Sequence, residues 1–148
     1  MKKLLFTLTL FIAFATQAQT LTEKDLLGTW KLSTSTMHGV LINFETGKVT
    51  TTEGYEDAYS PEEIQKIEQG IKGEHPFPLS VTFDKGNSIT FLVGKEKEQH
   101  TYELIVKNGK TFIGDGTDEY EVQLENATVI TFFYANEDDG NVTISFKK

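Results

Sequence analysis

The amino-acid sequence predicts an all-β domain, an antiparallel up-and-down barrel of about 8–10 strands with one short helix around residues 61–72. Two features of the sequence lead to this prediction. Short segments in which apolar and polar residues alternate recur about every 8–12 residues, and tight turns rich in Gly, Asn and Asp separate them. These turns are too short for long crossover connections, which favours an up-and-down barrel over a Greek-key sandwich.

A predicted export signal precedes this domain. Two lysines follow the initiating methionine, residues 4–14 are apolar, and the small residue Ala18 precedes the expected cleavage site, which is the pattern of a secretory signal peptide. The apolar run is shorter than the roughly 20 residues of a membrane-spanning helix, and no Cys follows it to carry a lipid anchor. We therefore expect a cleavable signal peptide at 1–18 and a single domain at 19–148. This domain is expected in the periplasm or secreted, without stable membrane insertion.

The charge and composition of the chain argue against several classes of function. The 148-residue chain has a formal net charge of −8, and loss of Lys2 and Lys3 with the signal peptide brings it to −10. Such an acidic surface repels nucleic acids and anionic membranes. Arg, the usual bidentate partner of phosphate and carboxylate, is absent, and so is Cys, which removes thiolate chemistry. We predict no cofactor, no metal and no nucleic-acid partner.

The first elements of the domain are predicted from capping and alternation. Thr22 can cap a single helical turn. An extended strand follows over about 28–35, with Trp30 on its apolar face. Two further strands, at about 40–44 and 49–53, precede the helix.

The predicted helix has clear start signals. Ser60 is a favourable N-cap, Pro61 suits the first helical position, and Glu63 completes a capping box. Three isoleucines follow at helical spacing and form a narrow apolar stripe. This stripe predicts a helix that lies against a sheet or covers an opening.

From residue 79 onward the chain is predicted to form consecutive hairpins. Asn108-Gly109 is typical of a type I′ hairpin turn, and Asp-Gly pairs indicate further turns. The predicted strands cover residues 79–83, 89–93, 101–106, 112–113, 119–124, 128–135 and 142–146.

One motif carries a resemblance to a known family. Residues 27–32, Leu-Gly-Thr-Trp-Lys-Leu, lie just after the predicted helical turn and resemble the Gly-x-Trp opening of lipocalins and lipocalin-like domains. Residues 81–84 (Val-Thr-Phe-Asp) and 145–147 (Ser-Phe-Lys) are similar to segments of the small lipocalin-like domains exported by Bacteroidetes-type bacteria. Most members of that group have no assigned activity.

The resemblance implies an up-and-down barrel of about eight strands. Its Trp would close one end, and small apolar ligands would occupy the other. Lipocalins usually stack an Arg over this Trp. Here the candidates for that position are Lys147 and Lys148, through a cation–π contact.

The aromatic residues are the candidate ligand-binding residues. Alternation predicts that several of them point in the same direction from different strands. Either they fill the barrel completely or they line a cavity for a small apolar ligand. Trp30 is interpreted either as a plug of the barrel end or as a ligand-stacking residue. The candidate ligand-binding residues are Trp30, Phe83, Phe91, Tyr102, Tyr120 and Phe133. Tyr102 and Tyr120 are also candidate polar contacts inside a cavity.

Catalytic and metal-binding patterns are weak. The chain has no Gly-x-Ser-x-Gly elbow and no phosphate-binding Gly-rich loop. The carboxylates of Glu103, Glu119 and Glu121 are predicted on outward faces. No two of the three histidines, which are His38, His75 and His100, have metal-ligand spacing, and the acidic turns at 115–119 and 137–141 do not match a calcium-binding loop. We therefore do not expect an enzyme.

Two functional hypotheses follow. The first is an exported, non-enzymatic, lipocalin-like barrel that binds a small apolar ligand. The alternative is a protein-interaction or inhibitor module that uses the 53–78 segment, with Tyr55, Tyr59 and Phe77, together with the barrel-end loops. A barrel cavity of about 300 Å³ or more would favour the first hypothesis.

Overall fold

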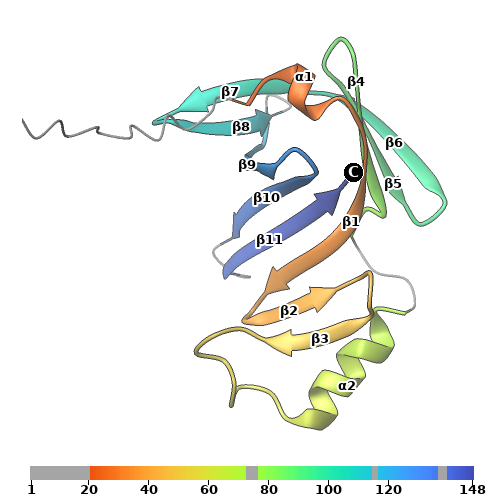
Figure 1. Ribbon diagram of the computed structural model, residues 1–148, viewed down its shortest axis with the longest axis vertical. Coiled ribbons are helices and arrows are strands. Elements are labelled where there is room, and N and C mark those ends of the chain that lie inside the picture. Colours follow the sequence, from red (N-terminus) through yellow and green to blue (C-terminus); the bar gives the residue numbers. More distant parts are fainter. Residues whose placement is uncertain (1–20, 73–76, 115–116, 137–139) are drawn as a thin grey trace, which may run out of the picture.

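The computed structural model describes residues 21–72, 77–114, 117–136 and 140–148 (Figure 1). The predicted signal peptide, His75 and parts of both acidic turns (residues 115–116 and 137–139) lie outside the described residues. The described chain forms two short helices and eleven strands. Their bounds are α1 Glu23–Leu26, β1 Gly28–Met37, β2 Val40–Asn43, β3 Lys48–Thr51, α2 Pro61–Gly70, β4 Ser80–Asp84, β5 Ser88–Val93, β6 Glu96–Thr101, β7 Glu103–Lys107, β8 Lys110–Gly114, β9 Glu119–Asn126, β10 Val129–Asn136 and β11 Gly140–Lys147.

The predicted all-β, antiparallel fold with one short helix near residues 61–72 is confirmed. The strand order is β6-β5-β4-β1-β11-β10-β9-β8-β7, and this sheet curls strongly into a half-barrel (Figure 1). Strand β1 is central. One edge of β1 pairs with β11, and the other pairs with β4 near its start and with β2 near its end.

The structure has one strand more than the upper end of the predicted range. The additional strand is β6, whose six residues are all exposed and show no apolar alternation. This strand forms because it pairs with β5, and the local sequence does not predict that pairing. Strands β6 and β7 stand at opposite ends of the hydrogen-bonded order, and the chain joins them directly through Tyr102.

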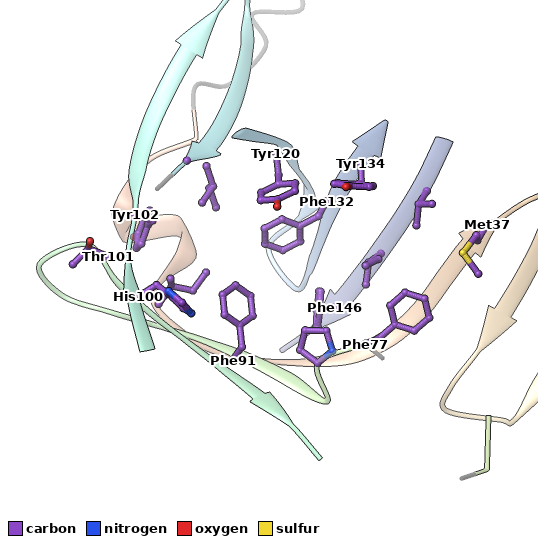
Figure 2. Close-up of a pocket in the computed structure, with 16 residues that line it drawn as sticks. Met37, Phe77, Phe91, His100, Thr101, Tyr102, Tyr120, Phe132, Tyr134 and Phe146 are labelled. Carbon is purple, nitrogen blue, oxygen red and sulfur yellow. The ribbon is translucent and has the colours of Figure 1, made fainter. Parts of the chain in front are cut away.

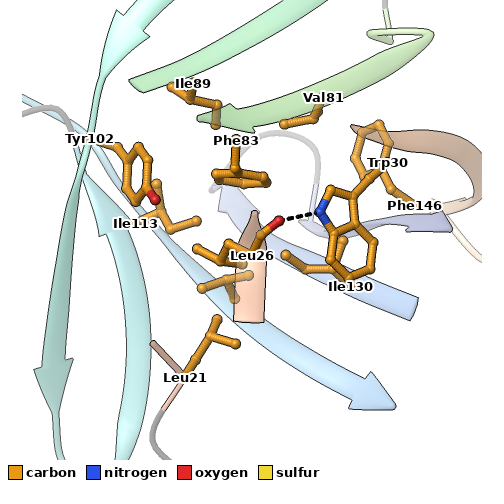
Figure 3. Packing of buried hydrophobic residues seen from close by; sticks show 11 residues of the cluster. Leu21, Leu26, Trp30, Val81, Phe83, Ile89, Tyr102, Ile113, Ile130 and Phe146 are labelled. Atoms are coloured by element: carbon orange, nitrogen blue, oxygen red, sulfur yellow. Dashed lines mark hydrogen bonds between the residues drawn. The ribbon is translucent and has the colours of Figure 1, made fainter. Parts of the chain in front are cut away.

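The main hydrophobic core lies at the end of the barrel that α1 covers (Figure 3). Trp30 is completely buried there, and its indole Nε1 donates a hydrogen bond of 2.6 Å to the Leu26 carbonyl oxygen. The Lys148 ammonium lies 4.3 Å from the centre of the Trp30 ring. Of the two candidates Lys147 and Lys148, it is therefore Lys148 that makes the cation–π contact, which contributes about 0.5–1 kcal/mol at an exposed position.

A β-bulge in β1 changes which residues face the barrel interior. The pairing with β11 shifts between Leu32 and Thr34. Leu32 stands opposite Phe146 before the shift, and Ser35 stands opposite Ile144 after it. Because Phe146 and Ile144 share the inner face of β11, the bulge brings the small side chain of Ser35 inward where simple alternation would have placed Thr34.

A second, smaller hydrophobic cluster lies below the barrel, where α2 packs on the β2–β3 hairpin (Figure 1). Its buried members are Val40, Ile42 and Val49, and the apolar stripe of α2 covers them. The predicted capping box starts this helix: the Ser60 side chain accepts from the Glu63 amide, and the Glu63 carboxylate accepts from the Ser60 amide at 2.8 Å.

Candidate functional site: an aromatic cavity

A cavity of about 480 Å³ lies inside the curled sheet (Figure 2). Its size exceeds the roughly 300 Å³ at which small-molecule sites begin. Half of the described residues that line it carry aromatic rings. The cavity therefore offers a ligand mostly flat apolar surface.

One wall of the cavity comes from β9, β10 and β11. Tyr120 and Tyr134 stack with ring centres 5.6 Å apart, and Phe132 meets Phe146 edge-on at 5.7 Å. Phe132 stands opposite Ile144 in the β10–β11 ladder, so both side chains leave the sheet on the same face. The aromatic rings of this wall therefore pack against one another.

The facing wall comes from β5 and β6. The Phe91 ring meets the His100 ring at 6.1 Å in an edge-on arrangement. The His100 Nε2 atom lies 4.0 Å from a Glu98 carboxylate oxygen. Both His100 and Glu98 are solvent-exposed, so this side forms the rim of the cavity.

A third part of the lining connects the cavity to the second hydrophobic cluster. Met37 at the end of β1 and Phe77 after α2 both line the cavity (Figure 2). The Phe77 ring also lies 5.8 Å from the ring of Phe44, which packs against the β2–β3 cluster. The cavity is therefore bordered by both regions of the molecule.

The predicted candidate residues divide into two groups. Phe91, Tyr102 and Tyr120 line the cavity. Trp30 and Phe83 are 0% and 1% exposed and lie in the main core outside the lining. Their positions fit the plug interpretation of Trp30 and not the ligand-stacking one.

The predicted orientation of Phe133 is wrong. Phe132 stands opposite both Val122 and Ile144 on the inner face, which places Phe133 on the outer face of β10. The sequence from 128 to 135 is apolar on both faces, so alternation could not distinguish the two phenylalanines. The pairing with β11, whose alternation is clear, was the signal that could have identified Phe132.

Tyr102 forms part of the wall with its ring and not with its hydroxyl. The side chain is 2% exposed and packs edge-on against Phe83 at 5.4 Å. Its hydroxyl oxygen is fully buried and has no hydrogen-bond partner. A hydroxyl that faced a cavity of this size would have accessible surface, so it is directed into the core. Burial, followed by the negative charge of Glu23, raises the pKa of Tyr102 above its usual value.

The chemistry of the lining is apolar with a few neutral polar groups. The described lining residues include no Asp, Glu or Lys, and their polar side chains are tyrosines, Thr101 and His100. Within the described ranges no three His, Asp or Glu side chains group in a way that could hold a metal ion. No helix of the described chain is long and apolar enough to cross a bilayer.

The aromatic residues of the 53–78 segment are mostly engaged inside the molecule. The Tyr59 hydroxyl donates to the His38 carbonyl oxygen at 2.7 Å, and its ring packs on the second cluster. Phe77 lines the cavity. Tyr55 remains 47% exposed. Its ring packs so closely against Gly39 that a Cβ atom at position 39 would overlap the ring.

The fold and the cavity together define a class of protein, an antiparallel β-barrel with an internal apolar site. The chain matches no protein-family model, no curated protein and no solved structure. The function of the chain is therefore inferred from the geometry of the cavity and from the sequence.

Proposed function

We propose that this protein is an exported, lipocalin-like, non-enzymatic barrel that binds a small apolar molecule in its cavity. The observation that carries the proposal is the 480 Å³ space lined by aromatic and aliphatic side chains. Apolar surface in such a cavity is poorly hydrated, and a ligand that fills it gains dispersion contacts and removes its own apolar surface from water.

Export is the second part of the proposal. The basic start, the apolar run and the small residue before the cleavage site support a signal peptide. A ligand-binding barrel released into the periplasm or the medium would meet apolar molecules from the cell envelope. Mass spectrometry of the mature protein, purified from an envelope fraction, tests this part through its N-terminal residue, which we expect to be Gln19.

Ligand binding is tested by incubating the mature protein with an envelope lipid extract and identifying what co-purifies by mass spectrometry. We expect one or a few apolar molecules at near-equimolar amounts. Their absence, together with no binding of a panel of small apolar probes, would contradict the proposal.

A matched pair of variants tests whether the ligand binds in the cavity. Phe132→Trp adds volume inside the cavity, whereas Phe133→Trp adds the same volume on the outer face of the same strand. We expect the first variant to weaken binding about tenfold or more, because the larger ring occupies ligand space. The second variant should bind like the wild type. Equal effects of the two variants would show that the ligand lies elsewhere.

The interaction-module hypothesis stays a prediction. Tyr55 is the exposed aromatic of the 53–78 segment that the structure describes, whereas Tyr59 and Phe77 contact other parts of the chain. A pull-down from envelope proteins with wild type and Tyr55→Ser tests it.

A further inference from the structure

We infer that the ligand of the cavity is an uncharged molecule, and that the site rejects the carboxylate form of an otherwise identical ligand. This inference rests on the proposed function and adds the charge class of the ligand. It follows from the distribution of charge around the cavity.

The wall provides no positive side chain to pair with an anion. The described lining includes no Lys, and the chain contains no Arg. His100 is the lining residue that could become a cation, and the carboxylate of Glu98 already lies 4.0 Å from its Nε2 atom. An entering anion would compete with Glu98 for His100.

The rim itself is acidic. Glu98 stands directly opposite Phe91 in the β5–β6 ladder, so the two side chains leave the sheet on the same face. Phe91 lines the cavity, which places the Glu98 carboxylate on the cavity side of β6. Gln99 and Lys97 alternate to the opposite face of this strand. The positive charge of β6 therefore points away from the site.

Entry into the cavity also disfavours an ionised ligand. Such a ligand would lose its hydration and would meet the Glu98 carboxylate at the rim without a counter-ion. An uncharged hydroxyl or carbonyl group has a much smaller desolvation cost and is not repelled by this carboxylate.

The test compares two probes that share one ring system, naphthalenemethanol and naphthoate. At pH 7.5 the alcohol is neutral and the acid is fully ionised. Isothermal titration calorimetry with the mature protein should show binding of the alcohol. We expect the carboxylate to bind at least about tenfold more weakly, because its charge is left without a partner.

A charge-matched pair of variants assigns this preference to the rim. Glu98→Gln and Gln99→Lys each make the protein more positive by one charge, the first on the cavity face of β6 and the second on the opposite face. We expect Glu98→Gln to strengthen naphthoate binding several-fold and to leave the alcohol unchanged. Gln99→Lys should leave the ratio of the two affinities as in the wild type.

The outcomes distinguish the proposed ligand binding from the proposed charge preference. If neither probe binds, the proposed function loses its support. If the wild type binds naphthoate as tightly as the alcohol, binding stands and the charge preference is wrong. Equal effects of Glu98→Gln and Gln99→Lys would show that only the net charge matters, which also contradicts the assignment to the rim.

Discussion

The two ends of the barrel are built from the same kinds of residue, yet one is filled and the other is hollow. At the α1 end, the rings of Trp30 and Phe83 are fully buried among aliphatic side chains (Figure 3). At the other end, the rings of Phe91, Tyr120 and Phe132 surround about 480 Å³ of space (Figure 2). Aromatic content therefore does not decide whether a barrel end is packed.

The two ends differ in the side chains that lie inside the barrel. The α1 segment brings Leu21 and Leu26 into the core at the closed end. At the open end the bulge in β1 turns the small Ser35 side chain inward. Strands β6 and β7 are the two terminal strands of the sheet order, and Tyr102 joins them in the chain. A filled end thus requires an additional segment inside the barrel, and the described chain supplies one at the Trp30 end.

Truncation of an aromatic residue should give the largest difference in stability loss between the two ends. Trp30→Ala leaves a large void in a packed core and removes the hydrogen bond to Leu26, so we expect the free energy of unfolding to fall by about 3–5 kcal/mol. Phe132→Ala enlarges an existing cavity around a partly exposed ring, and we expect about half that loss. Urea denaturation of both variants measures the difference. Equal losses would mean that the open end is as tightly packed as the closed end.

The sequence was sufficient for the parts of this comparison that depend on local patterns. Strand alternation, the Asn108-Gly109 turn and the Ser60 capping box all correspond to elements of the structure. The resemblance to lipocalins left Lys147 and Lys148 as candidates for a contact with Trp30, and Lys148 makes it. These features depend on neighbours in sequence or on a very short list of candidates.

Features set by long-range pairing could not be predicted. Strand β6 has no apolar pattern and forms because β5 offers an edge. The inward side of β10 depends on its register with β11, which is why Phe132 and not Phe133 lines the cavity. The cavity volume depends on how several strands curl together, and no single segment encodes that curvature.

Removal of the Tyr102 hydroxyl should have a smaller effect of opposite sign. The hydroxyl is buried at the boundary of the two ends without a hydrogen-bond partner, and such a group costs about 1–3 kcal/mol relative to its hydrated state. We expect Tyr102→Phe to raise the free energy of unfolding by about 1 kcal/mol and to preserve probe binding. A loss of stability would show that the hydroxyl has a partner, such as a buried water molecule.

Loss of the α2 cap should affect the β2–β3–α2 region alone. Ser60→Ala removes the side chain that accepts from the Glu63 amide, which typically costs about 1 kcal/mol. We expect faster hydrogen exchange in α2 and unchanged exchange around Trp30. Probe affinity should change little, because the described lining of the cavity includes no residue of α2. Faster exchange around Trp30 would instead show that both clusters unfold together.

The smallest expected effect distinguishes the two capping boxes by their dependence on pH. Hydrogen bonds from Thr22 lower the pKa of Asp25 at the closed end, and those from Ser60 lower the pKa of Glu63 in α2. Because each folded-state pKa lies below the unfolded value, the unfolded chain binds more protons near pH 4. The stabilisation is therefore present above that pH and is lost as the pH falls through the folded pKa.

The side-chain hydrogen bond from Thr22 is the largest cause for Asp25, whereas the backbone bond from Ser60 is the largest for Glu63. A backbone bond survives mutation to Ala. Thr22→Ala should thus bring the Asp25 pKa closer to its usual value than Ser60→Ala brings that of Glu63. NMR titration of the two carboxyl groups between pH 2.5 and 6, about two units around their ordinary values, measures both shifts. If Ser60→Ala has the larger effect, the side-chain hydroxyl, and not the amide, holds the α2 carboxylate.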